Sequence, residues 1–362
     1  MELNLRQLNR ATLARQLLLK REKTGALKAI ERLVAMQAQL PRPPFVGLWS
    51  RVAKFERKEL AKLLDRRAVV RGTMLRGTLH LMSAKDFLAF RAIFSSMLEK
   101  SVAGVLRERA AGLDIPRLAA QATAFLEQGP RTFEEIRAHL VGGNPKGDER
   151  AMGFAVRCAL QLVQVPTGAA WSFPTDSKFA LASQWLDKPA APGTDARPLV
   201  LRYLAAFGPA SVAGMQAWSG LKDLVEVFQA LRPSLKLFRD SRGRELFDLP
   251  KAPRPKEDVA APVRFLPDYD NLVLGHADRS RIIADAHRTL IATRNLQILP
   301  TFLVDGFVAG TWKIERARVS ATLTMTPFEP IAKKAREELI AEGCGLLKFV
   351  EPDAGKQLVL FA

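Results

Sequence analysis

A weak internal repeat in the middle of the chain restricts the folds that this sequence can adopt. FLEQGPRTFEEIRAHL and YLAAFGPASVAGMQAW each place Gly-Pro before a hydroxyl residue, Thr132 or Ser211, that can cap a helix, and the two copies are offset by 79 residues. A further helix follows in each copy (DERAMGFAVRCALQL, capped by Asp148, and LKDLVEVFQAL), and then a segment with the pattern of a β-hairpin (LVQVPTGAAWSFP and LKLFRDSRGRELFDL). Three helices followed by a hairpin are typical of a winged helix-turn-helix.

The N-terminal segment can be interpreted in the same way. We expect helices at roughly residues 25–38, 44–53 and 57–66, followed by two strands in AVVRGTMLRGTLHLMS. The last hundred residues differ, because VRFLPDYDNLVLGHADRSRII, ILPTFLVDGFVAGTWKIER and ATLTMTPF have the pattern of strands. Asp305-Gly306 predicts a hairpin turn, and a closing helix is expected at about 330–342.

The expected fold class is therefore α+β, with three tandem winged helix-turn-helix units and a C-terminal β-rich region. We expect the first unit at residues 1–110, the second at 111–190, the third at 191–250 and the β-rich region at 260–362. The segment PKAPRPKEDVAAP is the expected linker before the last region.

The charge of the chain indicates a polyanionic partner. The formal net charge is +18, and the first hundred residues hold 21 Lys or Arg against 8 Asp or Glu. Cys158 and Cys344 have no second sulfur or histidine at metal-ligand spacing, so no metal site or disulfide framework is expected. The N-terminus lacks the apolar core of a signal peptide, and no stretch has the roughly 20 apolar residues of a membrane span. We expect a monomeric, cytoplasmic, nucleoid-associated protein that binds DNA and no membrane.

Two glutamines, Gln37 and Gln39, occupy positions where an apolar residue would be expected. Gln37 continues the apolar stripe of the preceding helix, which consists of Leu27, Ile30, Leu33 and Val34. Leu40 precedes Pro41, which disfavours helical geometry, so we expect the helix to unwind around 37–40. An extended chain would let both carboxamides face one cleft. The alternative is a glutamine that satisfies backbone carbonyls at a helix end.

A second polar group is expected on a nearby strand. In LRGTLHLM, alternation places Arg76, Thr78 and His80 on one face and the leucines on the other. This face and the two glutamines could converge on a DNA cleft. An ordinary half-exposed strand is the alternative.

Four segments of the sequence carry a resemblance to a known family: VAMQAQLP, RGTMLRGTLHLMSAKD, FLPDYDNLVLGHADRSRII and VDGFVAGTWKIER. They resemble the winged-helix DNA glycosylases of the AlkZ and YcaQ type. That bacterial family excises bulky alkylated bases and unhooks interstrand crosslinks. The resemblance implies a C-shaped arrangement around a basic concave surface, with double-stranded DNA carrying alkylated guanine or crosslinks as substrate and no cofactor. It implies that Gln37 and Gln39 form a catalytic Gln-x-Gln motif. The residues expected to contact DNA are Arg71, Arg76, Thr78, His80, Trp312 and Lys313.

The chemistry of an amide is consistent with a labile substrate. An N7-alkylated guanine is already cationic, so it can leave without being protonated. A carboxamide can position water and stabilise charge, although it cannot act as a general base. No lysine is identified as a Schiff-base nucleophile, so we expect a monofunctional glycosylase without lyase activity.

Other interpretations remain open at this point. One group consists of three acids and a histidine: Asp268, Asp270, His276 and Asp278. These residues could form a metal site or supply a catalytic carboxylate. Alternatively, they could cap helices and form salt bridges to Arg279 or Arg281. Trp312 could stack on a base or belong to the core. The competing classes are a transcription regulator and a structural nucleoid protein. The acidic, apolar helix LKDLVEVFQAL would read a major groove poorly.

Overall fold

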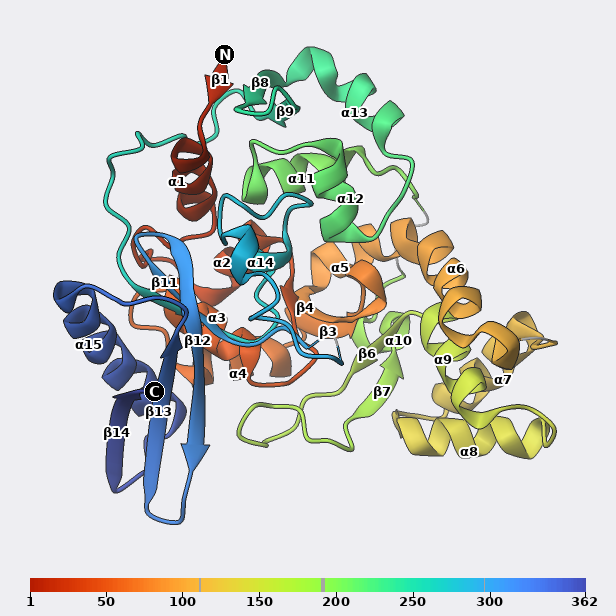
Figure 1. The fold of residues 1–362 in the computed structure, drawn as a ribbon. Coiled ribbons are helices and arrows are strands. Elements are labelled where there is room, and N and C mark those ends of the chain that lie inside the picture. The colour runs from red at the N-terminus through yellow and green to blue at the C-terminus, as the bar shows by residue number, and fades with distance from the viewer. Residues whose placement is uncertain (111, 190–192, 296) are drawn as a thin grey trace.

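Three segments of the chain repeat one order of elements in the computed structural model, which describes residues 1–110, 112–189, 193–295 and 297–362 (Figure 1). Unit one (residues 26–83) contains α2 (Ala26–Leu33), β2 (Met36–Gln37), α3 (Pro43–Arg51), α4 (Arg57–Asp65), β3 (Val69–Thr73) and β4 (Leu79–Ser83). Unit two (residues 115–181) contains α7 (Ile115–Glu127), β5 (Arg131–Thr132), α8 (Phe133–Gly143), α9 (Glu149–Ala159), β6 (Leu162–Gln164) and β7 (Lys178–Leu181). Unit three (residues 197–248) contains α11 (Arg197–Phe207), α12 (Val212–Ser219), α13 (Val225–Leu231), β8 (Lys236–Asp240) and β9 (Glu245–Asp248).

The strand pairing is also the same in the three units. After the first helix, a short extended segment pairs antiparallel with the last strand of the hairpin. The paired residues are Gln37 and His80 in unit one, Arg131 and Phe179 in unit two, and Ala210 and Phe247 in unit three. Units one and two share a six-stranded sheet in the order β2-β4-β3-β6-β7-β5, joined where Gly72 lies opposite Val163.

The helix caps confirm the predictions made from the repeat. The side chain of Thr132 accepts a hydrogen bond from the Glu135 amide, and the Glu135 carboxylate accepts one from the Thr132 amide. Ser211 caps α12 and Asp148 caps α9 in the same manner. Each oxygen satisfies an amide that a helix leaves without a partner, so the local sequence determines where these helices begin.

Additional elements connect and cover the units. They are α5 (Ala84–Phe90) and α6 (Ser95–Leu106) after unit one, α10 (Ala182–Leu186) after unit two, and β1 (Glu2–Leu3) and α1 (Leu5–Arg15) at the N-terminus. β1 adds to the β8–β9 hairpin in parallel, next to the N-terminus in Figure 1. The first fifteen residues therefore pack with unit three. None of the helices within the described ranges has the length and apolar character needed to cross a bilayer.

The C-terminal region is a five-stranded sheet in the order β10-β11-β12-β13-β14, with α15 (Lys333–Val350) packed against it (Figure 1). Its strands are β10 (Arg264–Leu266), β11 (Thr301–Val304), β12 (Phe307–Arg316), β13 (Ser320–Pro327) and β14 (Lys356–Phe361). The Asp305-Gly306 turn is confirmed, with φ of 46° and 84°. The prediction that the strand continues beyond Leu266 is wrong, because the chain turns there into the short helix α14 (Asn271–Leu274). The last strand, β14, was not predicted from the sequence.

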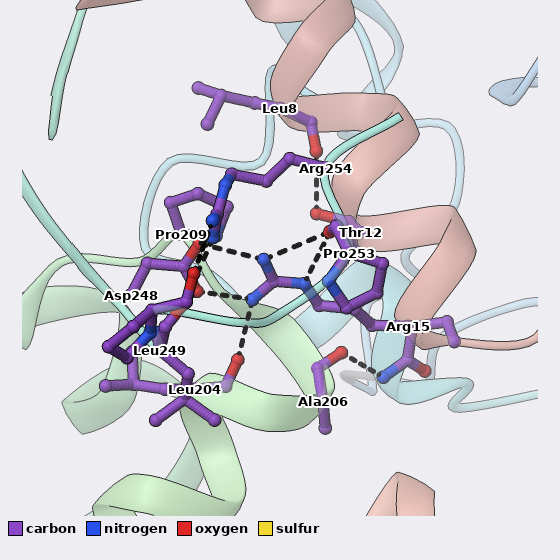
Figure 2. Close-up of polar contacts among 12 residues, drawn as sticks. Leu8, Thr12, Arg15, Leu204, Ala206, Pro209, Asp248, Leu249, Pro253 and Arg254 are labelled. Carbon is purple, nitrogen blue, oxygen red and sulfur yellow. Dashed lines mark hydrogen bonds and ion pairs between the residues drawn. The ribbon is translucent and has the colours of Figure 1, made fainter. Parts of the chain in front are cut away.

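A buried ion pair fastens α1 to unit three (Figure 2). Arg15 donates from Nη1 and Nη2 to the two carboxylate oxygens of Asp248, at 2.6 and 2.9 Å, and from Nη1 to the Leu204 carbonyl at 2.9 Å. Both charged side chains are fully buried, and Arg254 also donates to Asp248. The bidentate geometry and the additional partners offset the cost of removing these charges from water.

We expect Asp248→Ala to lower the free energy of unfolding by about 3–5 kcal/mol, because it leaves the Arg15 guanidinium buried without its counter-ion. Thermal or urea denaturation followed by circular dichroism measures this loss. Glu56→Ala is the control, since Glu56 and Lys58 form an exposed pair whose contribution to stability should be small. Equal, small effects of the two substitutions would show that the buried pair does not fasten α1.

Candidate functional site

Gln37 lies in a short strand and not at a helix end. The prediction that the preceding helix reaches residue 38 is wrong, because Val34 adopts a φ of 69° and α2 stops at Leu33. The next residues run extended and pair with β4, and the Ala38 amide donates to the Leu79 carbonyl at 2.8 Å. Gln37 is 7% exposed, whereas Gln39 is exposed and accepts only a long bond of 3.4 Å from the Leu79 amide. The two carboxamides therefore lie at different depths.

The guanidinium of Arg76 fixes the orientation of the Gln37 side chain. Arg76 Nη2 donates to Gln37 Oε1 at 2.7 Å and to Asn271 Oδ1 at 3.2 Å, and Nη1 donates to the Trp218 carbonyl. A guanidinium has no acceptor, so the amide oxygen of Gln37 must face Arg76 and its NH2 group must point elsewhere. Asn271 is held in turn, because its Nδ2 donates to the Ala35 carbonyl at 2.9 Å.

The backbone of Arg76 explains why its side chain points inward. The prediction that LRGTLHLM is one strand is wrong for its first half, since Leu75–Gly77 form a 3₁₀ turn in which Arg76 has a φ of 54°. The end of α12 packs closely on this turn, and a Cβ at Gly220 would lie 3.1 Å from Arg76 Cα. Arg76, Thr78 and His80 therefore do not share one exposed strand face.

His80 and Thr78 stabilise the turn. Thr78 Oγ1 donates to the Leu75 carbonyl at 3.1 Å, and His80 Nδ1 lies 3.1 Å from the Thr78 carbonyl. The expectation that His80 faces a DNA cleft is wrong in this structure, because its side chain is fully buried. Burial, with the charge of Arg76 as a second cause, lowers the pKa of His80 to about 3, so the ring is neutral at physiological pH.

Arg71 holds the backbone of the Gln-x-Gln segment. Its Nε donates to the Ala38 carbonyl at 2.8 Å and its Nη2 to the Gln39 carbonyl at 3.2 Å, while the guanidinium lies over the Phe173 ring. The side chain is buried, and burial lowers its pKa to about 10. Arg71 is thus placed next to the glutamines, but in contact with protein and not with solvent.

The two candidates on β12 lie apart from this group. Trp312 is 3% exposed and donates from Nε1 to the carbonyls of Leu266 and Thr301, at 2.9 and 3.1 Å, so it belongs to the core. An exposed Trp312 that stacks on a base is therefore wrong for this structure. Lys313 is exposed, with its ammonium 3.0 Å from the Glu315 carboxylate.

The proximity of Arg279 to Arg76 was not predicted from the sequence. Burial, with the charge of Arg279 as a second cause, lowers the pKa of Arg76 to about 10, which leaves it protonated at neutral pH. Within the described part of the chain, Arg279 forms no salt bridge, which contradicts its expected role as a partner of the acidic group. The acid that precedes it, Asp278, pairs instead with Arg242 and Arg244. Because Asp278 precedes Arg279 in the sequence, local reasoning predicted an ion pair that the described residues do not form.

The residues considered as metal ligands serve separate purposes. Asp270 pairs with Arg51 at 2.8 Å, Asp278 pairs with arginines of unit three, and His276 packs against Tyr203 and Phe207. Over the residues that the structure describes, no three His, Cys, Asp or Glu side chains gather as a metal site would require.

A small cavity lies beside Gln37. Its volume is about 20 Å³, enough for one water molecule. Its polar wall includes Gln16, Gln37, Arg51, Asp268, Asp270 and Asn271. Burial raises the pKa of Asp268, while the charge of Arg42 opposes that shift. The arrangement can hold a water molecule between a fixed carboxamide and a carboxylate.

Comparisons with known proteins identify a family and two similar proteins. The family model described as DNA glycosylase AlkZ-like matches residues 30–349. The chain is 26% identical to the interstrand DNA cross-link repair glycosylase of Streptomyces sahachiroi, over 91% of each sequence. The fold is similar to the solved structure of Streptomyces sahachiroi DNA glycosylase AlkZ, with a TM-score of 0.81, 20% identity and full coverage of both chains.

Proposed function

This chain belongs to the AlkZ-like DNA glycosylase family, and from that premise we propose that it hydrolyses the N-glycosidic bond of cationic N7-alkylated purines in double-stranded DNA. The observation that carries the proposal is the Gln37 carboxamide, held in one orientation by Arg76 at the wall of a water-sized polar cavity. The name of the Streptomyces sahachiroi relative supports interstrand crosslinks as further substrates.

The charge of the substrate determines what the site must supply. An N7-alkylguanine takes the bonding electrons as a neutral base, so no acid is needed to protonate it. The enzyme then has to position a water molecule and stabilise the developing sugar cation, which fixed dipoles can do without reorganisation. Gln37 and Gln39 are proposed for these tasks. We propose no lyase step, because the cations that hold this segment are arginines, and a guanidinium does not form a Schiff base.

The repeated units are proposed to serve as winged helix-turn-helix modules. Their common order of helix, short strand, two helices and hairpin supports this assignment. We propose that the three units and the C-terminal region form a C-shaped, basic concave surface that binds duplex DNA through phosphate contacts, and that the enzyme acts as a monomer. The excess of basic residues in the first hundred supports this surface. Lys313 is the predicted β12 contact that remains exposed.

The first expected outcome concerns substrate charge. Matched duplexes with a single N7-methylguanine or a single uracil should differ, with N7-methylguanine released and uracil released far more slowly or not at all. Single-turnover rates are measured by cleaving abasic sites with alkali, and without alkali the product strand should remain intact. Comparable rates on both lesions would contradict the proposal, because they would require an acid that protonates or stabilises a neutral leaving group.

The second expected outcome concerns the roles of Gln37 and Gln39. Gln37→Ala and Gln39→Ala should each lower the single-turnover rate on the order of a hundredfold, the usual cost of losing one positioned hydrogen bond in a transition state. Affinity for undamaged duplex, measured by fluorescence anisotropy, should not change. Gln184→Ala, on the exposed side of α10, is the matched control and should behave as wild type. Unchanged base release by the Gln37/Gln39 double variant would remove the motif from the mechanism.

The third expected outcome shows whether Arg76 positions Gln37 or binds DNA. Because Arg76 contacts Gln37, Asn271 and Trp218, Arg76→Ala should slow base release even when the enzyme saturates the DNA. A residue that only bound phosphate would show a defect that disappears at high enzyme concentration. The measurement is the single-turnover rate as a function of enzyme concentration, which separates the maximal rate from the half-saturating concentration.

A further inference from the structure

Hydrolysis of a glycosidic bond by water releases a proton, and Gln37 cannot accept it. An amide is not basic enough, and one face of the Gln37 oxygen already accepts from Arg76 at 2.7 Å. The NH2 group of Gln37 can only donate. A side chain that accepts this proton from a water beside Gln37 would come from another part of the chain.

The cavity next to Gln37 has two carboxylates on its wall, and they differ in their partners. Asp270 accepts two hydrogen bonds from Arg51, at 2.8 and 2.9 Å, and caps α14 through the Leu272 amide at 2.9 Å. Both of its oxygens are thus engaged in structural contacts. Asp268 is 7% exposed and forms no salt bridge among the residues that the structure describes.

The backbone around Asp268 is held on both sides. The Leu266 carbonyl accepts from the buried Trp312 indole at 2.9 Å, and the Asp270 amide donates to the Pro267 carbonyl at 3.3 Å, which closes a turn. Trp312, which the sequence suggested as a DNA contact, therefore positions the segment that carries Asp268. A carboxylate on a fixed turn can accept a proton without rearrangement.

We propose that Asp268 is the general base of the reaction, acting on a water molecule in the cavity that it shares with Gln37. This inference rests on the proposed glycosylase function. One water proton moves to the Asp268 carboxylate, while the water oxygen forms a bond to C1′ of the deoxyribose. The C1′–N9 bond breaks, and its electron pair leaves with the base and neutralises the positive charge of the alkylated ring. Gln37 donates a hydrogen bond that orients the water.

The groups around Asp268 determine its pH dependence. Burial raises its pKa and is the largest effect, while the positive charge of Arg42, the backbone amide of Asp268 and a hydrogen bond from the Gln297 side chain lower it. Tyr269 lies beside it in the chain, and the Asp270 carboxylate across the cavity is neutralised by Arg51. A base must be deprotonated, so base release should decline as the pH falls through this raised pKa. The decline should begin at a higher pH than an exposed aspartate would give.

The experiment compares wild type, Asp268→Asn and Asp268→Glu on duplex DNA with one N7-methylguanine, using single-turnover rates from pH 4.5 to 9. Asparagine keeps the size of the side chain and removes the base. We expect Asp268→Asn to be at least on the order of a hundredfold slower, with no decline at acidic pH, and to keep wild-type affinity for undamaged duplex. Asp268→Glu should restore part of the rate and the acidic decline. Asp258→Asn changes an exposed carboxylate between β9 and β10, and its rates and pH profile should match wild type.

Failure of this inference can be distinguished from failure of the proposed function. A wild type that releases N7-methylguanine, together with an Asp268→Asn variant of equal rate and equal pH profile, would overturn the role of Asp268 and leave the glycosylase intact. A wild type that releases no N7-methylguanine would overturn the proposed function. If Asp268→Asn does not fold, as judged by circular dichroism, the wild-type profile decides, because a rate independent of pH at the acidic end would overturn the inference.

Discussion

The guanidinium of Arg76 joins three distant parts of the chain around a single carboxamide. It donates to Gln37 in unit one, to the Trp218 carbonyl in unit three and to Asn271 in the C-terminal region. A cation buried without a carboxylate partner costs stability, and burial accordingly lowers its pKa. The structure tolerates an unfavourable charge in order to fix that amide.

The position of Gln37 can be compared across the three repeated units. In each unit the residues after the first helix form a short extended segment against the last hairpin strand, with Gln37, Arg131 and Ala210 at corresponding places. The position is held by backbone hydrogen bonds, so its side chain can vary without loss of the pairing. Among the described residues, unit one alone carries a carboxamide at this position, with Asn271 and Asp268 of the C-terminal region beside it. The candidate site thus combines a repeated scaffold with a part of the chain that is not repeated.

Local signals made much of the fold predictable from the sequence. The caps at Thr132 and Ser211 and the turn at Asp305-Gly306 depend on neighbouring residues, and the structure confirms them. The burial of His80 and the turn at Arg76 could not be predicted in that way. Arg76 is held by partners 142 and 195 residues away in the chain, and no local pattern encodes those contacts. The segment with Gln37 and Gln39 could be selected as a candidate site because glutamines stand where apolar residues are expected. The orientation of these side chains depends on tertiary packing and could not be predicted.

Under the proposed function, bound DNA would complete the electrostatics of the candidate site. Arg76 and Arg279 repel one another, and burial lowers the pKa of both, but within the described part of the chain neither has an acidic partner. Two uncompensated positive charges would oppose the development of positive charge on a sugar, since each acts in a medium of low dielectric constant. A duplex in this position would bring phosphates that neutralise Arg279, which is the less buried of the two. The negative charge of a deprotonated Asp268 would act in the same direction at the cavity itself. Without DNA, the charges of the site would destabilise a sugar cation, and with DNA bound they would stabilise it. The same charges would then contribute to both DNA binding and catalysis.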